Sequence, residues 1–228
     1  MPPLAVILPA AGSSARFGRD KLAEPLGGVP VLARTLLAVL GHPAVAQVVV
    51  ATPDELRTRG ILRAGGGPLD GRVTFAPGGA TRAHSVWNAA RAVRADVEWV
   101  AVHDAARPLM SAGLIDRTLA TAVTHDGAAA PALPVGLTVK RATGPLPAAV
   151  RETVPRHDLW AMQTPQIARR TALLDAFDRC PLPLEQVTDD VQLIELAGGA
   201  VWLVPGEERN LKITTATDLR LAELLLGT

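Results

Sequence analysis

The sequence predicts an α/β fold in which helices cover both faces of a mainly parallel sheet. Short apolar or β-branched runs, such as Leu4–Leu8 and Gln47–Thr52, are typical of strands that are buried on both faces. These runs alternate along the chain with segments of helical periodicity, such as Pro30–Leu40 and Thr81–Arg94. A regular alternation of this kind indicates β-α-β units, which build parallel sheets.

Each element follows from its local pattern. In chain order, strands are expected over Leu4–Leu8, Gln47–Thr52, Arg72–Ala76, Glu98–Val102, Ala128–Val135, Leu159–Gln163 and Ala200–Val204. Helices are expected over Pro30–Leu40, Asp54–Arg63, Thr81–Arg94, Ser111–Thr124, Arg169–Arg179, Thr188–Ala197 and Thr217–Leu226. Thr81 and Ser111 are expected N-caps, because a hydroxyl at that position accepts a bond from the first helical turn.

The alternation breaks over residues 136–157, a stretch that contains three prolines. Two β-like pieces lie within it, Leu137–Arg141 and Ala148–Thr153. We therefore expect an arm or hairpin that projects from the sheet, and not a second domain. Residues 1–228 would then form a single domain, since the length suits one domain and 48% of the residues are apolar.

Composition excludes several classes of function. A formal net charge of +1 gives no general attraction to nucleic acid or to an anionic membrane. No apolar run approaches the roughly 20 residues of a membrane-spanning helix. The start lacks the basic and apolar regions of a signal peptide, and the single cysteine, Cys180, allows no intramolecular disulfide. We expect a soluble protein of the cytoplasm.

Lysine is rare in this chain, which has twenty arginines but only Lys21, Lys140 and Lys212. An ammonium group is a compact, strongly hydrated charge, unlike the planar guanidinium of arginine. Each lysine is therefore a candidate for contact with phosphate. The alternative is that these three merely escaped a general drift toward arginine.

The strongest local motif is the glycine- and serine-rich stretch Pro9–Lys21, which directly follows the first expected strand. Small residues let successive N–H groups approach phosphate oxygens, and Arg16 and Lys21 add positive charge. The spacing from Gly12 to Gly18 fits neither a P-loop nor a dinucleotide fingerprint. We expect a phosphate-binding loop; the alternative is a flexible surface loop.

Further polar clusters also lie where expected strands end. Gly78–Ser85 leads into a helix and could admit a base or ribose, or form only a tight turn with a solvated arginine. Asp104 could bind Mg²⁺ or a substrate hydroxyl, or pair with Arg107 to fix the loop; His103 beside it is read as structural. Lys212 lies in a β-like run, where a lysine reaches a ligand or extends to solvent.

Taken in order, these motifs resemble one family. The matching stretches are PAAGSSARFG, PGGATRAHSV, VHDAARP, the T-x-K of LTVKR, LWAMQTPQ, TDD and NLKIT, which together run from residue 9 to 214. The chain resembles the 2-C-methyl-D-erythritol 4-phosphate cytidylyltransferases of the non-mevalonate isoprenoid pathway. PAAG is shared by many nucleotidyltransferases, whereas VHDAARP together with TPQ and NLKIT is much more specific.

The resemblance implies a Rossmann-like three-layer α/β/α sandwich of the nucleotide-sugar transferase type, with a protruding β-arm. It implies transfer of CMP from CTP to 2-C-methyl-D-erythritol 4-phosphate, by in-line attack on the α-phosphate. It also implies Mg²⁺ held mainly by the CTP phosphates, with no metal site of the protein's own. The arm would exchange across a homodimer, so that Arg156 would reach the substrate of the neighbouring subunit.

The resemblance also assigns residues to three roles. Those that would hold cytosine and ribose are Ala10, Ala11, Gly12, Gly79 and Ser85. Those that would stabilise the reacting phosphates are Arg16, Lys21 and Lys212. Those that would surround the acceptor, with Arg156 and Lys212, are Asp104, Arg107, Thr138, Thr164 and Thr188.

The chain departs from the family pattern at three positions. Asp20-Lys21-Leu22 stands where the family often has Pro-Lys-Gln, and Leu137 stands where an Asp usually precedes the arm threonine. Ala80 replaces a commonly acidic residue. Two enzyme alternatives stay open. One is a cytidylyltransferase for ribitol 5-phosphate, which would share the loop and differ in the arm pocket; the other is an enzyme using GTP or UTP, because a base read by backbone is poorly discriminated by sequence. A catalytically silent nucleotide-binding regulator is the rival from another class.

Overall fold

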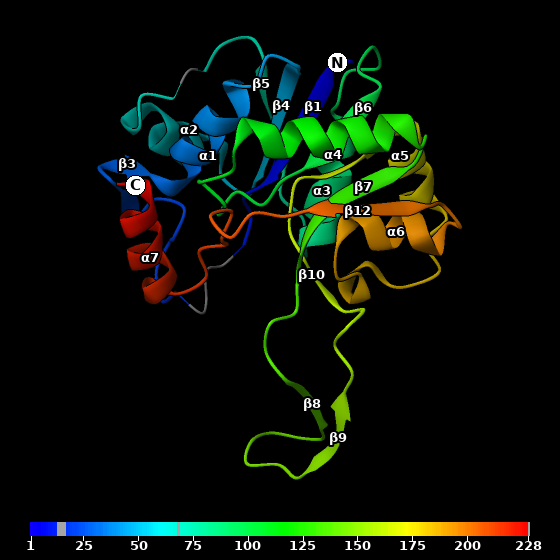
Figure 1. Ribbon diagram of the computed structural model, residues 1–228. Coiled ribbons are helices and arrows are strands. Elements are labelled where there is room, and N and C mark those ends of the chain that lie inside the picture. The colour runs from blue at the N-terminus through cyan, green and yellow to red at the C-terminus, as the bar shows by residue number, and fades with distance from the viewer. Residues whose placement is uncertain (13–16, 68, 228) are drawn as a thin grey trace.

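The computed structural model describes residues 1–12, 17–67 and 69–227 (Figure 1). Its main sheet consists of β1 (Leu4–Pro9), β4 (Val45–Thr52), β5 (Val73–Pro77), β6 (Trp99–Val102), β7 (Ala128–Pro134), β10 (Trp160–Met162), β11 (Gln166–Arg169) and β12 (Val201–Pro205). The helices are α1 (Val31–Leu40), α2 (Glu55–Ala64), α3 (Arg82–Arg91), α4 (Ala112–Thr124), α5 (Arg170–Asp178), α6 (Asp190–Leu196) and α7 (Ala216–Leu226), with a 3₁₀ turn at Leu184–Gln186.

The strands follow the order β10-β7-β11-β6-β1-β4-β5, and β12 pairs with β7. β5, β4, β1 and β6 are mutually parallel, and β12 runs parallel to β7. β11 is antiparallel to both β6 and β7, and β10 is antiparallel to β7. The predicted, mainly parallel sheet is confirmed. In such a sheet, ligands gather at the carboxyl ends of the parallel strands.

The side chains of β1 show how the three layers form. Leu4, Val6 and Leu8 belong to an apolar cluster on one face of the sheet, packed with residues of α1, α4 and α7. Ala5 and Ile7 belong to the cluster on the opposite face, packed with residues of α3, α5 and α6. Both faces of the strand are buried because successive side chains point to opposite sides. The residue pattern thus confirms the prediction of a sheet covered on both faces.

The helix starts agree with the capping chemistry of the sequence. The side-chain oxygens of Thr81 and Ser111 accept bonds from the backbone N–H groups of His84 and Leu114, at 3.3 and 3.1 Å. Both predicted N-caps are confirmed. At α6 the cap is Asp189, whose carboxylate accepts from the N–H of Gln192 at 3.0 Å. The helix therefore begins two residues later than the predicted start.

Three short features differ from the sequence prediction. β11 was not predicted, because four residues with polar ends give no clear apolar run. β2 (Pro25–Leu26) and β3 (Val29–Pro30) form a small hairpin that was also missed. Conversely, residues 210–214 form no strand, so the prediction of a β-like run was wrong there. This segment crosses the strand ends, where the Ile213 N–H bonds the Ala106 carbonyl.

The predicted arm is an antiparallel hairpin of β8 (Val139–Ala142) and β9 (Val150–Val154). Figure 1 shows it extending away from the main sheet and its helices. Leu137, Leu146 and Val150 are 82%, 86% and 58% exposed, so the arm displays apolar side chains to solvent within this single chain. Among the described residues, no helix combines the length and apolarity needed to cross a membrane.

Candidate active site

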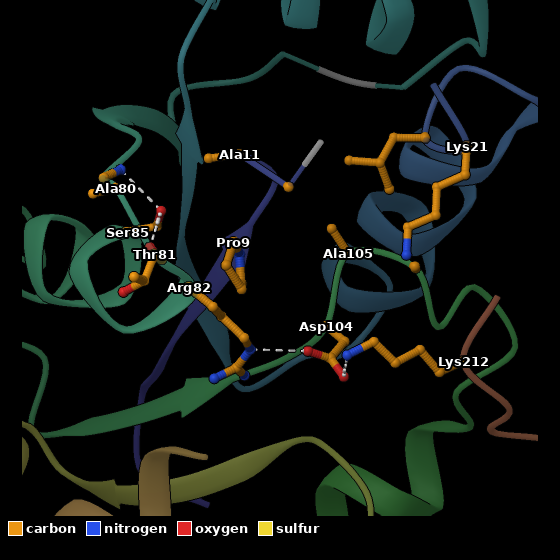
Figure 2. A pocket seen from close by; sticks show the side chains of 14 residues that line it. Pro9, Ala11, Lys21, Ala80, Thr81, Arg82, Ser85, Asp104, Ala105 and Lys212 are labelled. Atoms are coloured by element: carbon orange, nitrogen blue, oxygen red, sulfur yellow. Dashed lines mark hydrogen bonds and ion pairs between the residues drawn. The ribbon is translucent and has the colours of Figure 1, made fainter. Parts of the chain in front are cut away.

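A cavity of about 390 Å³ opens at the carboxyl ends of β1, β5 and β6 (Figure 2). Its wall is formed by the segment after β1, the turn between β5 and α3, the loop after β6, and two lysines from other segments. The lining residues are Pro9, Ala11, Gly12, Lys21, Leu22, Gly79, Ala80, Thr81, Arg82, Ser85, Asp104, Ala105, Ala106 and Lys212. The polar clusters that the sequence placed at separate strand ends therefore share one cavity.

The turn between β5 and α3 is built around Gly79 and Ser85. The Gly79 N–H donates to Oγ of Ser85 at 2.9 Å, and that hydroxyl donates to the Thr81 carbonyl at 3.0 Å. A Cβ on Gly79 would lie 2.3 Å from Cβ of His84, so only glycine lets the turn fold this tightly. Backbone atoms consequently form this part of the wall, which suits recognition of a base or ribose by close approach.

Asp104 is the carboxylate around which the cationic side chains of the site gather. Its Oδ1 accepts a hydrogen bond from Nε of Arg82 at 3.2 Å. Its Oδ2 pairs with Nζ of Lys212 at 3.0 Å and with Nε of Arg107 at 3.2 Å. Figure 2 shows Arg82 and Lys212 reaching this carboxylate from opposite sides. Burial raises the pKa of the Asp104 carboxyl, but the three cations outweigh burial and leave the pKa well below its ordinary value. Asp104 is therefore ionised throughout the neutral range.

Thr164 and His103 lie behind Asp104 and fix its loop. Oγ1 of Thr164 accepts from the Asp104 N–H at 3.0 Å and lies 3.0 Å from Nδ1 of His103. The other ring nitrogen, Nε2, lies 3.1 Å from the carbonyl of Arg107. Because a carbonyl can only accept, Nε2 carries the proton, and the Thr164 hydroxyl donates to Nδ1. Burial lowers the pKa of His103 to about 4, so the ring is neutral at pH 7.

The two cavity lysines come from opposite ends of the chain. Nζ of Lys21 donates to the carbonyl of Ile213 at 3.0 Å, next to Lys212 in sequence. Asp20 holds the Lys21 turn, because its Oδ1 accepts from the Leu22 N–H at 3.1 Å and its Oδ2 pairs with Arg57 of α2 at 2.7 Å. Side-chain bonds of Asp20 therefore shape the turn that carries Lys21.

The remaining predicted site residues lie elsewhere. Ala10 does not line this cavity but a neighbouring one, which shares Ala11 and Gly12 with it, and the Ala10 N–H donates to the Ala51 carbonyl at 2.8 Å. Thr188 precedes α6 and bonds the side chain of Gln192. Thr138 and Arg156 are exposed at the root of the arm, where the Arg156 guanidinium donates to the Gly136 carbonyl, and neither lines the cavity in this chain. The predicted catalytic residue Arg16 lies outside the described residues.

Two residues escaped the sequence prediction of the site. Arg82 lines the cavity and pairs through Nη2 with Oδ2 of Asp190 at 2.7 Å, and Asp190 is buried at the start of α6. The available signal for Arg82 was its place in the first turn of a helix that follows two glycines. The sequence was equally compatible with an arginine exposed to solvent at this position. Nothing in the sequence pairs residues that are 108 positions apart.

In the part of the chain that the structure describes, no group of three or more His, Cys, Asp or Glu side chains could hold a metal ion. Asp104 is the one carboxylate among the described residues that line the cavity, beside three cationic side chains. The cavity is therefore suited to an anionic ligand, such as a phosphate chain.

Comparison with known proteins identifies the family. The family model described as 2-C-methyl-D-erythritol 4-phosphate cytidylyltransferase matches residues 4–228. The chain is 41% identical to the protein of that name from Symbiobacterium thermophilum, with 98% of this chain and 93% of the relative covered. It is 40% identical to that from Dechloromonas aromatica, with 99% and 98% covered.

Solved structures agree with this result. The crystal structure of the Francisella tularensis 2-C-methyl-D-erythritol 4-phosphate cytidylyltransferase has a TM-score of 0.84 and 31% identity, and covers 97% of this chain and 99% of that one. The corresponding Thermus thermophilus structure has a TM-score of 0.78 and 36% identity, and covers 99% and 100%. As its motifs predicted, the chain belongs to the 2-C-methyl-D-erythritol 4-phosphate cytidylyltransferase family.

Proposed function

We propose that this cytidylyltransferase joins CMP from CTP to 2-C-methyl-D-erythritol 4-phosphate by in-line attack of the acceptor's phosphate oxygen on the α-phosphorus. The products are 4-diphosphocytidyl-2-C-methyl-D-erythritol and pyrophosphate, in the synthesis of isoprenoid precursors. The observation that carries the mechanism is that Lys21, Lys212 and Asp104 line the same cavity as the tight Gly79 turn. No protein nucleophile is needed, since the attacking phosphate is already an anion.

The nucleotide would occupy the side of the cavity formed by the segment after β1 and by the β5–α3 turn. Ala11 and Gly12 line that side, and Gly79 and Ser85 belong to the facing turn. The N–H of Ala10 ties this segment to β4. Base and ribose would then be recognised largely by backbone groups, which explains why the sequence alone discriminated the base poorly.

Positive charge would supply most of the catalysis. Two anions must meet, and negative charge then spreads over the equatorial and leaving oxygens of the α-phosphate. Lys21 and Lys212 flank the cavity, and their bonds to the Ile213 carbonyl and to Asp104 preorganise both ammonium groups. Arg16, as the third proposed cation, completes the set.

Mg²⁺ would be held by the triphosphate and not by a cage of carboxylates. The donor set fits this mode, since Asp104 is the one carboxylate among the described cavity residues and already pairs with three cations. Mg²⁺ commonly binds through phosphates and water with few protein ligands. When bound, the ion would act as a Lewis acid that withdraws negative charge from the phosphate oxygens.

The acceptor would bind around Asp104 and Lys212. An ionised Asp104 accepts hydrogen bonds from alcohol hydroxyls, and Lys212 beside it attracts the acceptor phosphate. Arg107 and Thr164 contribute through the bonds that hold the Asp104 loop. Thr188, in the segment before α6, is the remaining residue that the proposal assigns to the acceptor.

A second copy of the chain would complete the site. Thr138 and Arg156 lie at the root of an arm that extends away from the main sheet, and the arm exposes three large apolar side chains. Exposed apolar groups of this kind are stabilised when a partner covers them. Residues 1–228 would form one nucleotidyltransferase domain, with residues 136–157 as its dimerisation arm.

The test is a pyrophosphate-release assay with CTP, Mg²⁺ and 2-C-methyl-D-erythritol 4-phosphate. GTP, UTP and ATP replace CTP in parallel reactions, and ribitol 5-phosphate replaces the acceptor. The proposal predicts release with CTP and methylerythritol phosphate, and at most a small fraction of that rate with each substitute. Faster release with ribitol 5-phosphate would reassign the acceptor, and no release with CTP and either acceptor would reject the proposed function.

A further inference from the structure

Asp190 is a buried carboxylate to which the proposed mechanism gives no role. It begins α6, is 3% exposed and does not line the cavity. Its backbone N–H donates to Oε1 of Gln166 at 2.8 Å, which ties the start of α6 to β11. Its carboxylate receives Nη2 of Arg82 at 2.7 Å. Burying a carboxylate has a high cost of desolvation, so the pairing of Asp190 with Arg82 calls for an explanation.

Arg82 bridges two carboxylates along one edge of its guanidinium. Nε donates to Oδ1 of Asp104 at 3.2 Å, and Nη2 on the same edge donates to Oδ2 of Asp190 at 2.7 Å. Rotation toward either carboxylate would break the bond to the other. The guanidinium is therefore fixed by Asp190 on one side while it holds Asp104 on the other. Its planar fork sets the direction of both bonds, whereas the donors of a lysine ammonium rotate freely.

The bridge determines how Asp104 faces the cavity. A carboxylate offers roughly four acceptor positions. Arg82 occupies one on Oδ1, while Arg107 and Lys212 share Oδ2. About one position on Oδ1 then remains for a ligand hydroxyl. Without Arg82, the Asp104 carboxylate could turn about its side-chain bond, and that remaining position would no longer have a fixed direction.

We propose that Asp190 and Arg82 are positioning residues for the acceptor subsite: Asp190 orients the Arg82 guanidinium, which aims the free acceptor position of Asp104 at a hydroxyl of the sugar alcohol. The inference rests on the proposed function, which assigns Asp104 to the acceptor. It makes the start of α6 part of acceptor recognition, although Asp190 does not line the cavity. A purely structural ion pair would instead affect stability and leave both Michaelis constants unchanged.

Asp190→Asn is the first test, because it removes a charge and leaves every cavity-lining side chain in place. Losing a charge-assisted hydrogen bond typically changes an equilibrium by roughly tenfold to a hundredfold. We expect the KM for methylerythritol phosphate to rise by about tenfold, and the KM for CTP to change by less than about twofold. Arg82→Lys keeps the charge, loses the fork, and should give at least the same rise.

A double variant separates positioning from stability. Each single change leaves one buried charge without its partner and can destabilise the fold. Arg82→Met with Asp190→Asn removes both charges, so the free energy of unfolding should return toward that of the wild type. The acceptor KM should nevertheless stay raised, because Oδ1 of Asp104 is still unsupported.

Arg169→Lys is the matched control. Arg169 also bridges two carboxylates, Glu98 and Asp126, with a similar exposed fraction, but it lies beside the start of β6, at the opposite end of that strand from Asp104. Its acceptor KM should equal that of the wild type. Wild-type turnover in the same assay establishes the proposed function independently. Given that turnover, a double variant with an unchanged acceptor KM would overturn the inference, as would an equal rise in the KM for CTP.

Discussion

Nζ of Lys212 lies 3.0 Å from Oδ2 of Asp104, so the proposed phosphate-binding lysine and the proposed hydroxyl-binding carboxylate are direct partners. They come from segments far apart in the chain, the loop after β6 and the irregular stretch before α7. The pair fixes the ammonium group before any ligand arrives. Preorganised charge of this kind is effective in catalysis, since it needs no reorientation as the transition state forms.

Removal of either cavity lysine should therefore slow the reaction with the fold intact. By analogy with single electrostatic donors, Lys21→Ala and Lys212→Ala should each lower kcat by roughly 10²–10³, or about 3–4 kcal/mol of activation free energy. Arg94→Ala, which removes an exposed cation paired with Asp96, is the control and should retain wild-type turnover. Steady-state kinetics with circular dichroism measure both properties. Near-normal turnover in either lysine variant would remove that residue from the mechanism.

His103 should make stability depend on pH between about 6.5 and 4. Its pKa falls from an ordinary 6.5 to about 4 on burial. Between these pH values the imidazole therefore binds a proton in the unfolded chain but not in the folded chain. The contribution of the neutral ring is fully present above pH 6.5 and is lost as the pH falls toward 4. A difference of this size corresponds to about 3 kcal/mol.

Urea unfolding at about pH 7 and about pH 4.5 tests this expectation. The wild type should lose more stability between the two pH values than His103→Gln, which has no imidazole to protonate. His157→Gln, at an exposed position, should behave like the wild type. Equal losses in wild type and His103→Gln would contradict this expectation, because they would show that the ring binds its proton as readily in the folded chain as in the unfolded chain.

Two Gly→Ala substitutions should have opposite effects. Gly79→Ala places a Cβ 2.3 Å from Cβ of His84 and 2.7 Å from its carbonyl carbon, so the first turn of α3 must shift. We expect a loss of roughly 1–3 kcal/mol in the free energy of unfolding and a higher KM for CTP. Gly60→Ala, in the interior of α2, adds a Cβ that meets nothing within 4 Å beyond its chain neighbours and the backbone of its own helix, and should stabilise by about 0.5–1 kcal/mol. Thermal unfolding and CTP titration of both variants measure these effects. A Gly79→Ala variant with wild-type stability and a wild-type KM for CTP would contradict the account.

Mixing two inactive variants tests whether the arm acts across a dimer. If Arg156 serves the neighbouring subunit, a heterodimer of Arg156→Ala and Lys212→Ala subunits contains one intact site. Random exchange should then restore about a quarter of wild-type activity, since half of the dimers are mixed and each has one of two sites. Light scattering should show a dimer. Action within one chain predicts no recovery on mixing, and a monomer would exclude the shared site.

The sequence predicted the architecture well because its signals are local. Buried strands such as β1 and capped helices such as α3 are encoded in runs of a few residues, and the hairpin at residues 136–157 was marked by its prolines. β11 was missed because its four residues carry no alternation. The segment around Lys212 looked β-like, yet its bonding partners lie across the strand ends and are invisible to a local pattern.

The candidate site could be predicted only in part, for a similar reason. Ala11, Gly12, Lys21, Gly79, Ser85, Asp104 and Lys212 all line one cavity, since carboxyl ends of neighbouring parallel strands meet at one edge. Arg82 and Asp190 were not assigned, because their pairing depends on how α3 and α6 pack. The cytosine and the acceptor alcohol came from family resemblance, as a backbone-lined wall leaves little trace in residue type.

The central claim is that the phosphate oxygen of the acceptor attacks the α-phosphorus of CTP, and isotopic labelling tests it most directly. Methylerythritol phosphate labelled with ¹⁸O in its nonbridging phosphate oxygens is incubated with CTP, Mg²⁺ and the enzyme, and both products are analysed by mass spectrometry. The account predicts that all label stays in 4-diphosphocytidyl-2-C-methyl-D-erythritol and that pyrophosphate is unlabelled. Label in pyrophosphate, or CMP bound covalently to the protein before acceptor is added, would contradict it.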